Sequence, residues 1–274
     1  MRAFGFIRRS TPIHRLTGAS KLILTFILSI SAMITFDTRF LVFVIVLSLT
    51  MFKMSKIKLS DFKAVMALLV IFMVINNVAI YLFAPEQGTL IYGTRTELAF
   101  ITQRYRITSE QLFYQLNVSL KYLAIVPIAL LFFLTTDPGE FASSLNTIKV
   151  NYKVAYAVSL ALRYIPDVQQ AYREISQAQQ ARGVDISKKA PLRARLAGIL
   201  AILFPLVFSS MDKIELVGNA MELRGFGRLK KRSWYNARPF ARRDFIVIGL
   251  SVLCLLLSIT TIIINDGRFF NPFV

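Results

Sequence analysis

The sequence has 274 residues, of which 55% are hydrophobic, and it carries a formal net charge of +18. The mean hydropathy of +0.56 excludes an ordinary soluble domain and indicates an all-α polytopic membrane protein. The charge does not indicate nucleic-acid binding, because the basic residues lie between apolar runs, as in the cytoplasmic loops of membrane proteins. One cysteine, Cys254, and one histidine, His14, exclude an internal disulfide and argue against a metal site.

About five membrane-spanning helices are expected along the chain. The first apolar run follows a basic N-terminal stretch without a convincing cleavage site, so it indicates a retained helix rather than a signal peptide. The first two runs are short for a bilayer core of ~30 Å and are expected to extend into their flanks. The expected spans are residues 22–36, 40–52, 64–83, 110–134 and 245–264.

The charges of the loops predict the orientation of these helices. Lys53, Lys56, Lys58 and Lys63 place one loop on the cytoplasmic side, whereas residues 85–110 are nearly neutral and are expected to be external. Five crossings then leave the N-terminus cytoplasmic and the C-terminus external. Within the external loop, residues 89–92 and 98–101 predict a small β-hairpin, with an irregular loop as the alternative.

The expected organisation has three parts: N-terminal transmembrane helices over residues 1–136, a cytoplasmic-side domain over 137–243, and a C-terminal transmembrane helix over 244–274. The middle part begins with a helix-start sequence, residues 136–140, and carries 18 Lys/Arg against eight Asp/Glu up to residue 243. It also contains an apolar run, residues 196–208, that is too short to span a bilayer and is interrupted by Pro205. Long helices in the membrane interface are therefore expected here.

Two long helical patterns in this middle part end alike, with Ala, three residues, Arg and Gly. The first ends at Arg182-Gly183 and the second at Arg224-Gly225, 42 positions later. A glycine after the last helical residue is a common helix stop, and an arginine there suits the helix dipole, so two ordinary C-caps are one interpretation. The repetition favours the other interpretation, in which two cationic helix ends are presented to a partner.

Four short motifs follow one another along the chain: Leu134-Thr-Thr-Asp-Pro138, Ala161-Leu-Arg-Tyr-Ile-Pro166, Ala178-Gln-Gln-Ala-Arg-Gly183 and Ala220-Met-Glu-Leu-Arg-Gly-Phe226. Each motif is weak alone, but the four occur in this order on this topology. Together they resemble the transmembrane T component of energy-coupling factor (ECF) transporters, and the resemblance runs from Ile13-His14-Arg15-Leu16 to the last helix. The sequence departs from the family where an Asp-Pro pair often follows His-Arg-Leu, since Thr17-Gly18 stands there.

This resemblance implies a non-catalytic scaffold in the plasma membrane of a prokaryote. Its partners would be two cytoplasmic ABC-type ATPase subunits, a membrane S component that binds the vitamin or micronutrient, and the lipid bilayer. The chain would need no cofactor or metal, because ATP would bind to the partner ATPases; the absence of a phosphate-loop motif agrees with this. The ATPase-docking residues implied by the motifs are Ala181, Arg182, Gly183, Leu223, Arg224 and Gly225.

Two other classes of function remain as alternatives. An integral membrane enzyme acting on lipid-linked substrates would require acids or histidines clustered near the interface, whereas the acids here are scattered. A stand-alone secondary transporter would require ionisable residues at mid-membrane, and only Lys121, near the expected outer end of its helix, is a candidate. Neither alternative explains the paired arginines.

Overall fold

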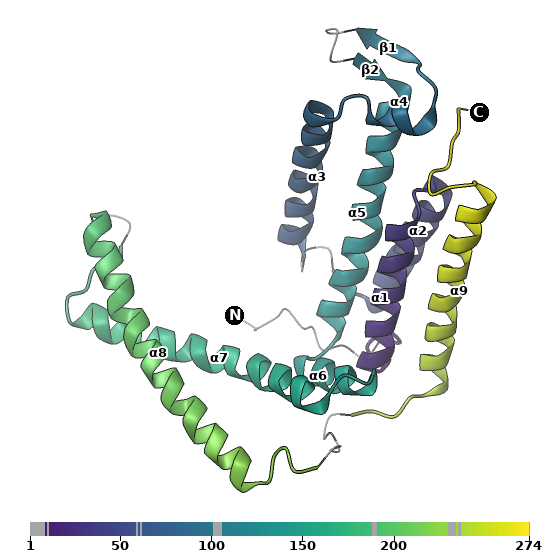
Figure 1. Ribbon diagram of the computed structural model, residues 1–274. Coiled ribbons are helices and arrows are strands. Elements are labelled where there is room, and N and C mark those ends of the chain that lie inside the picture. Colours follow the sequence, from purple (N-terminus) through teal and green to yellow (C-terminus); the bar gives the residue numbers. More distant parts are fainter. Residues whose placement is uncertain are drawn as a thin grey trace. The chain divides into compact units, whose positions relative to one another are not determined.

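The computed structural model describes residues 9, 11–58, 60, 62–100, 106–187, 191–229, 234 and 237–273. Over these residues the chain forms nine helices and one two-stranded antiparallel sheet (Figure 1). It divides into two compact units. Helices α6, α7 and α8 belong to one unit, and the other contains α1 to α5, the two strands and α9. The high helix content and the apolar helices described below confirm the expected all-α polytopic membrane fold.

Four helices pack together in the larger unit: α1 (Gly18–Ile34), α2 (Thr38–Ser55), α5 (Ser109–Thr135) and α9 (Arg242–Ile264). Lipid tails are as apolar as leucine, so close packing, more than the hydrophobic effect, holds such helices together in a bilayer. The buried positions fit this requirement, because many of them are small. The buried core residues are Leu24, Leu28, Ala32, Phe40, Leu41, Val44, Ala124, Ile128 and Cys254, and the serines Ser31, Ser251 and Ser258 are also buried.

Five of the described helices are long and apolar enough to cross a membrane: α2, α3 (Lys63–Phe83), α5, α8 (Leu192–Leu223) and α9. This set differs from the expected one in two helices. The first apolar run forms α1, which has only 17 residues. The expected interruption of the apolar run 196–208 at Pro205 was wrong, because the helix continues through Pro205 and α8 reaches 32 residues, long enough to cross a membrane.

The loop that was expected to hold a β-hairpin folds differently from the prediction. Strand β1 (Glu97–Phe100) pairs with β2 (Arg106–Thr108), whereas the segment expected to be its partner forms the short helix α4 (Gln87–Tyr92). Tertiary contact explains the helix: a Cβ at Gly88 would lie 2.5 Å from the backbone of Glu110, so α4 packs directly onto the start of α5. The amide of Gly88 also donates to the side-chain oxygen of Gln111 at 2.7 Å. Residue 101 lies outside the described residues.

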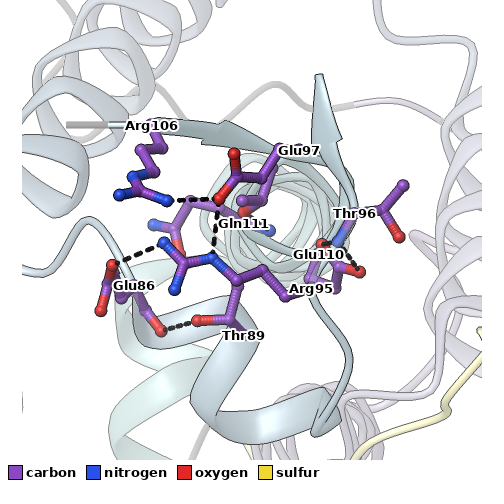
Figure 2. Close-up of polar contacts among 9 residues, drawn as sticks. Glu86, Thr89, Arg95, Thr96, Glu97, Arg106, Glu110 and Gln111 are labelled. Atoms are coloured by element: carbon purple, nitrogen blue, oxygen red, sulfur yellow. Dashed lines mark hydrogen bonds and ion pairs between the residues drawn. The ribbon is translucent and has the colours of Figure 1, made fainter. Parts of the chain in front are cut away.

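Ionic contacts connect α4 to the two strands. Figure 2 shows the guanidinium of Arg95 between the carboxylates of Glu86, at 3.3 Å, and Glu97, at 3.1 Å. Arg106 of β2 also pairs with Glu97, and its hydrogen bond holds the pKa of that carboxyl below its usual value. The carboxylate of Glu110 accepts from the amide of Thr96 at 2.9 Å. These contacts fix the loop on the start of α5.

The C-terminal tail, residues 265–273, returns to the same end of the larger unit. The amide of Phe36, in the turn between α1 and α2, donates to the carbonyl of Arg268 at 2.7 Å, and the ring of Phe36 stacks on Phe269 with centroids 4.4 Å apart. The side-chain amide of Asn271 donates to the carbonyl of Tyr92 at 3.2 Å. The tail therefore joins the α1–α2 turn to α4.

A buried carboxylate joins the first and last helices at the opposite end of the unit. Asp244 is 1% exposed, and its Oδ1 atom accepts from the amide of Thr17 at 2.8 Å and from the hydroxyls of Thr17 and Ser20 at 3.0 and 2.6 Å. Its Oδ2 atom accepts from the amide of Ala241 at 2.8 Å. We call Thr17, Ser20 and Asp244 the Asp244 cluster.

The smaller unit contains α6 (Pro138–Thr147), α7 (Tyr152–Ala181) and α8. Helix α6 begins at Pro138, as the helix-start sequence predicted, because a proline fits the first turn, where its missing N–H is not needed. Helices α7 and α8 contain Pro166 and Pro205 in their interiors and pack against each other as an antiparallel pair. The pair carries both arginine motifs.

Candidate functional site

The end of α7 has the geometry of a Schellman motif. The amide of Val184 donates to the carbonyl of Gln179 at 3.1 Å, and the amide of Gly183 donates to the carbonyl of Gln180 at 3.0 Å. Gly183 has φ +88°, a left-handed conformation that glycine adopts without the steric cost of a Cβ. We call Ala181, Arg182 and Gly183, all of which are exposed, the α7 arginine end.

The end of α8 repeats this geometry. The amide of Phe226 donates to the carbonyl of Met221 at 2.9 Å, and the amide of Gly225 donates to the carbonyl of Glu222 at 2.8 Å. Gly225 has φ +66°, again in the left-handed region. We call Leu223, Arg224 and Gly225 the α8 arginine end. Leu223 is 90% exposed and Arg224 is exposed, whereas Gly225 is half-buried. An exposed leucine beside an exposed arginine is a surface suited to a partner with both apolar and acidic groups.

The structure separates the two arginine ends instead of bringing them into one site. Tyr152, at the start of α7, packs against Phe226 beyond the end of α8, whereas Gln179, near the end of α7, contacts Ala201 in the first third of α8. The two helices therefore run antiparallel, with one arginine end at each end of the pair. A helix of 32 residues rises about 48 Å at 1.5 Å per residue. One small ligand cannot contact both ends, but two separate partners can.

A largely apolar groove of about 460 Å³ lies between α7 and α8. Its polar lining consists of Tyr164, Asp167, Ser210 and Lys213, and the remaining residues are aliphatic or small. Among the apolar lining residues are Leu160, Ala161, Val168, Ile214, Val217 and Met221. The arrangement offers an apolar surface between two cationic ends.

Each arginine end is supported by the beginning of the other helix, and sequence reasoning missed most of the supporting residues. The ring of Phe226 lies 4.8 Å from that of Tyr156 and 5.8 Å from that of Tyr152, one helical turn apart on α7. The spacing of four between these tyrosines is the signal that places both on one helix face. Beyond the α7 arginine end, Asp185 accepts from the amide of Ser187 at 2.8 Å, and this bond lowers the pKa of the Asp185 carboxyl.

Side chains that could support the alternative functions have structural partners. Among the described residues, no three His, Cys, Asp or Glu side chains gather into a group that could hold a metal ion. Lys121 of α5 is 8% exposed; its ammonium group donates to the carbonyl of Met33 at 2.8 Å and lies 3.1 Å from the ring centroid of Phe36. Lys121 therefore joins α5 to the end of α1.

Comparison with known proteins identifies the family. The family model described as cobalt transport protein, CbiQ, matches residues 9–234, which include both arginine ends. An energy-coupling factor transporter transmembrane protein EcfT from Bacillus selenitireducens is 29% identical over 256 residues, covering 90% of this chain and 92% of that relative. Proteins of the same name from Exiguobacterium sibiricum, 29% identical over 72% of this chain and 74% of that relative, and from Bacillus subtilis, 27% identical over 69% and 71%, also match. The chain therefore belongs to the CbiQ family and is a T component of an energy-coupling factor transporter.

Proposed function

We propose that this chain couples two cytoplasmic ABC-type ATPases to a substrate-binding S component, and that each arginine end docks on one ATPase. The observation that carries the proposal is the pair of matching Schellman ends on an antiparallel helix pair. Two equivalent ends suit two equivalent partners, and the length of α8 keeps the partners apart. Family membership supports the same assignment, because the relatives are named as transmembrane proteins of energy-coupling factor transporters.

The geometry of each end suits insertion into a groove on a partner. The glycine turns the chain away directly after the arginine, so the helix end is not blocked by the continuing backbone. An arginine fork can make two parallel hydrogen bonds to a carboxylate or to carbonyl oxygens, which a lysine cannot. Docking residues Arg182 and Arg224 would supply the charge, and Ala181, Gly183, Leu223 and Gly225 would complete each contact.

In this mechanism the chain has no catalytic step of its own. ATP would bind to the partner ATPases, and their closure would draw the two arginine ends together. Because α7 and α8 line the apolar groove together and contact each other beside it, such a movement would reach this groove. The S component would hold the substrate, a vitamin or micronutrient, and would contact the apolar membrane-side surface of this chain.

The proposed orientation follows the charge distribution. The basic helices of the smaller unit would face the cytoplasm, where the ATPases are, and the neutral loop with β1 and β2 would be external. The N-terminus would be cytoplasmic and the C-terminus external, in the plasma membrane of a prokaryote. Family membership argues against an integral membrane enzyme and a stand-alone secondary transporter, and no contact in the described residues favours either.

Charge reversal at the arginines tests the proposal. Loss of one partner from a desolvated charged contact costs about 2–5 kcal/mol, so Arg182→Glu and Arg224→Glu should each weaken retention of co-expressed ATPases and impair substrate uptake. The double variant should retain none, because two linked contacts reinforce each other. Lysine at both positions should restore retention only in part. If the double glutamate variant retains the ATPases fully, the arginines are helix caps and the proposal is wrong.

A further inference from the structure

Pro205 leaves one carbonyl of α8 without its helical partner. A proline has no N–H, so the carbonyl four residues before it, that of Ala201, cannot receive the usual hydrogen bond. The side-chain amide of Gln179 donates to this carbonyl at 3.2 Å. Gln179 belongs to the last turn of α7, and its own backbone carbonyl accepts the amide of Val184 in the Schellman motif. One residue therefore connects the α7 arginine end to the proline site of α8.

A second contact holds the segment that follows Arg182. The side chains of Val184 and Ile186 lie over Gly198 of α8, where a Cβ would be 3.0 Å from Val184 Cγ1 and 3.1 Å from Ile186 Cγ2. Both distances are shorter than ordinary van der Waals contact, so an alanine at this position would require the two side chains to move by a few tenths of an ångström. The chain is thus held against α8 on both sides of Arg182, by Gln179 before it and by Val184 and Ile186 after it.

We propose that Gln179 is a positioning residue for Arg182, and that it acts through the carbonyl that Pro205 frees. The direction of the α7 arginine end is then set by α8 as well as by the cap of α7. This inference rests on the proposed docking function. It also explains how a proline is tolerated inside α8: the hydrogen bond lost at Ala201 is replaced from α7, and the replacement fixes a docking residue.

The α8 arginine end is supported by different contacts, which makes the proposal selective. Phe226 packs on Tyr152 and Tyr156, which lie at the opposite end of α7 from Gln179. Substitution of Gln179 should therefore disturb Arg182 and leave Arg224 in place. The consequence for docking appears most clearly when Arg224 has been removed.

The test combines two measurements on the full chain in detergent. Hydrogen exchange of the amides of residues 183–187 reports the anchoring, and retention of the co-expressed ATPase pair in an Arg224→Glu background reports docking. Gln179→Leu should raise exchange about fivefold, the effect of losing one ordinary hydrogen bond, and should lower retention by a similar factor. Gln180→Leu is the matched control, because the Gln180 side chain bonds Ser176 on its own helix.

Pro205→Ala supplies the decisive comparison. The amide introduced at position 205 can donate to the Ala201 carbonyl and competes there with Gln179, so the Gln179 bond weakens and exchange should rise toward its level in Gln179→Leu. Gln179→Leu should then add little to Pro205→Ala. Fully additive effects, or equal exchange in Gln179→Leu and Gln180→Leu, would overturn the positioning role.

The same experiment distinguishes failure of this inference from failure of the proposed function. If Gln179→Leu raises exchange without lowering retention, while Arg182→Glu abolishes retention, docking stands and the positioning of Arg182 by Gln179 is wrong. If Arg182→Glu itself leaves retention unchanged in the Arg224→Glu background, the docking function is wrong, and the positioning role in docking falls with it.

Discussion

Removal of the Asp244 carboxylate should strongly destabilise the larger unit. In Asp244→Ala the buried amide of Thr17 loses its acceptor, the Thr17 hydroxyl loses one of its bonds, and the amide of Ala241 is also released. The Ser20 hydroxyl can still donate to the carbonyl of Thr17 at 2.8 Å, so losing its bond to Asp244 costs little. A buried donor left unsatisfied costs about 1–3 kcal/mol, and with the weaker losses the total is about 2–4 kcal/mol.

The single buried cysteine provides an assay for this prediction. Cys254 is 1% exposed, so a thiol-reactive fluorescent dye labels it only as the core opens, and the labelling midpoint on heating measures stability. The expected loss corresponds to a midpoint lower by roughly 5–12 °C. Asp244→Asn keeps the acceptor that faces Thr17 and loses only the bond to Ala241, so its shift should be less than half as large. Asp212→Ala, at an exposed position on α8, is the control and should not change the midpoint.

Two results would refute the reasoning. If Asp244→Ala melts with the wild-type midpoint, the four short contacts to this carboxylate contribute no net stability. If Asp244→Asn is as damaging as Asp244→Ala, the negative charge, rather than the acceptor geometry, is what the site requires.

Three further predictions concern the caps, the orientation and nucleotide binding. Gly183→Ala and Gly225→Ala each put a side chain on a residue with left-handed backbone, which costs about 1–2 kcal/mol. Each substitution should therefore shift its arginine end and weaken ATPase retention. The control Gly249→Ala, in mid-α9, should do neither. A cysteine at Thr96 should react with an impermeant reagent added outside intact cells, whereas one at Ser187 should not, and the reverse pattern would refute the proposed orientation. The purified chain alone should neither bind nor hydrolyse ATP, because it lacks a phosphate loop; hydrolysis that co-purifies with the chain after removal of all ATPase subunits would contradict this.

Helix ends were the most predictable features, because they depend on local chemistry. The sequence Ala-x-x-x-Arg-Gly predicted where α7 and α8 stop, and both glycines have the positive φ that the prediction requires. Thr108 likewise caps α5, accepting from the amide of Gln111 at 3.3 Å. Each of these features involves residues fewer than six positions apart, so no knowledge of the tertiary fold was needed.

The features that sequence reasoning missed depend on contacts between distant residues. Residues 89–92 have strand-like composition, but Gly88 packs on the backbone of α5 and the segment folds as helix α4. Pro205 suggested an interruption, but Gln179 from another helix satisfies the carbonyl it frees. The location of Arg182 and Arg224 at helix ends was predictable because helix ends were. Their supports, Phe226 on Tyr156 and Val184 on Gly198, were not, because they lie across a helix pair.

The Asp244 cluster has a consequence for the order in which the chain can be assembled. It joins residues 227 positions apart, and the C-terminal tail likewise contacts the turn between the first two helices. During synthesis, α1 enters the bilayer while the residues that satisfy the amide of Thr17 have not yet been made. Until the ribosome has completed the last helix, the amide and hydroxyl of Thr17 must therefore form hydrogen bonds with water or lipid headgroups instead of with Asp244. A chain truncated before α9 would leave the amide of Thr17 without this acceptor.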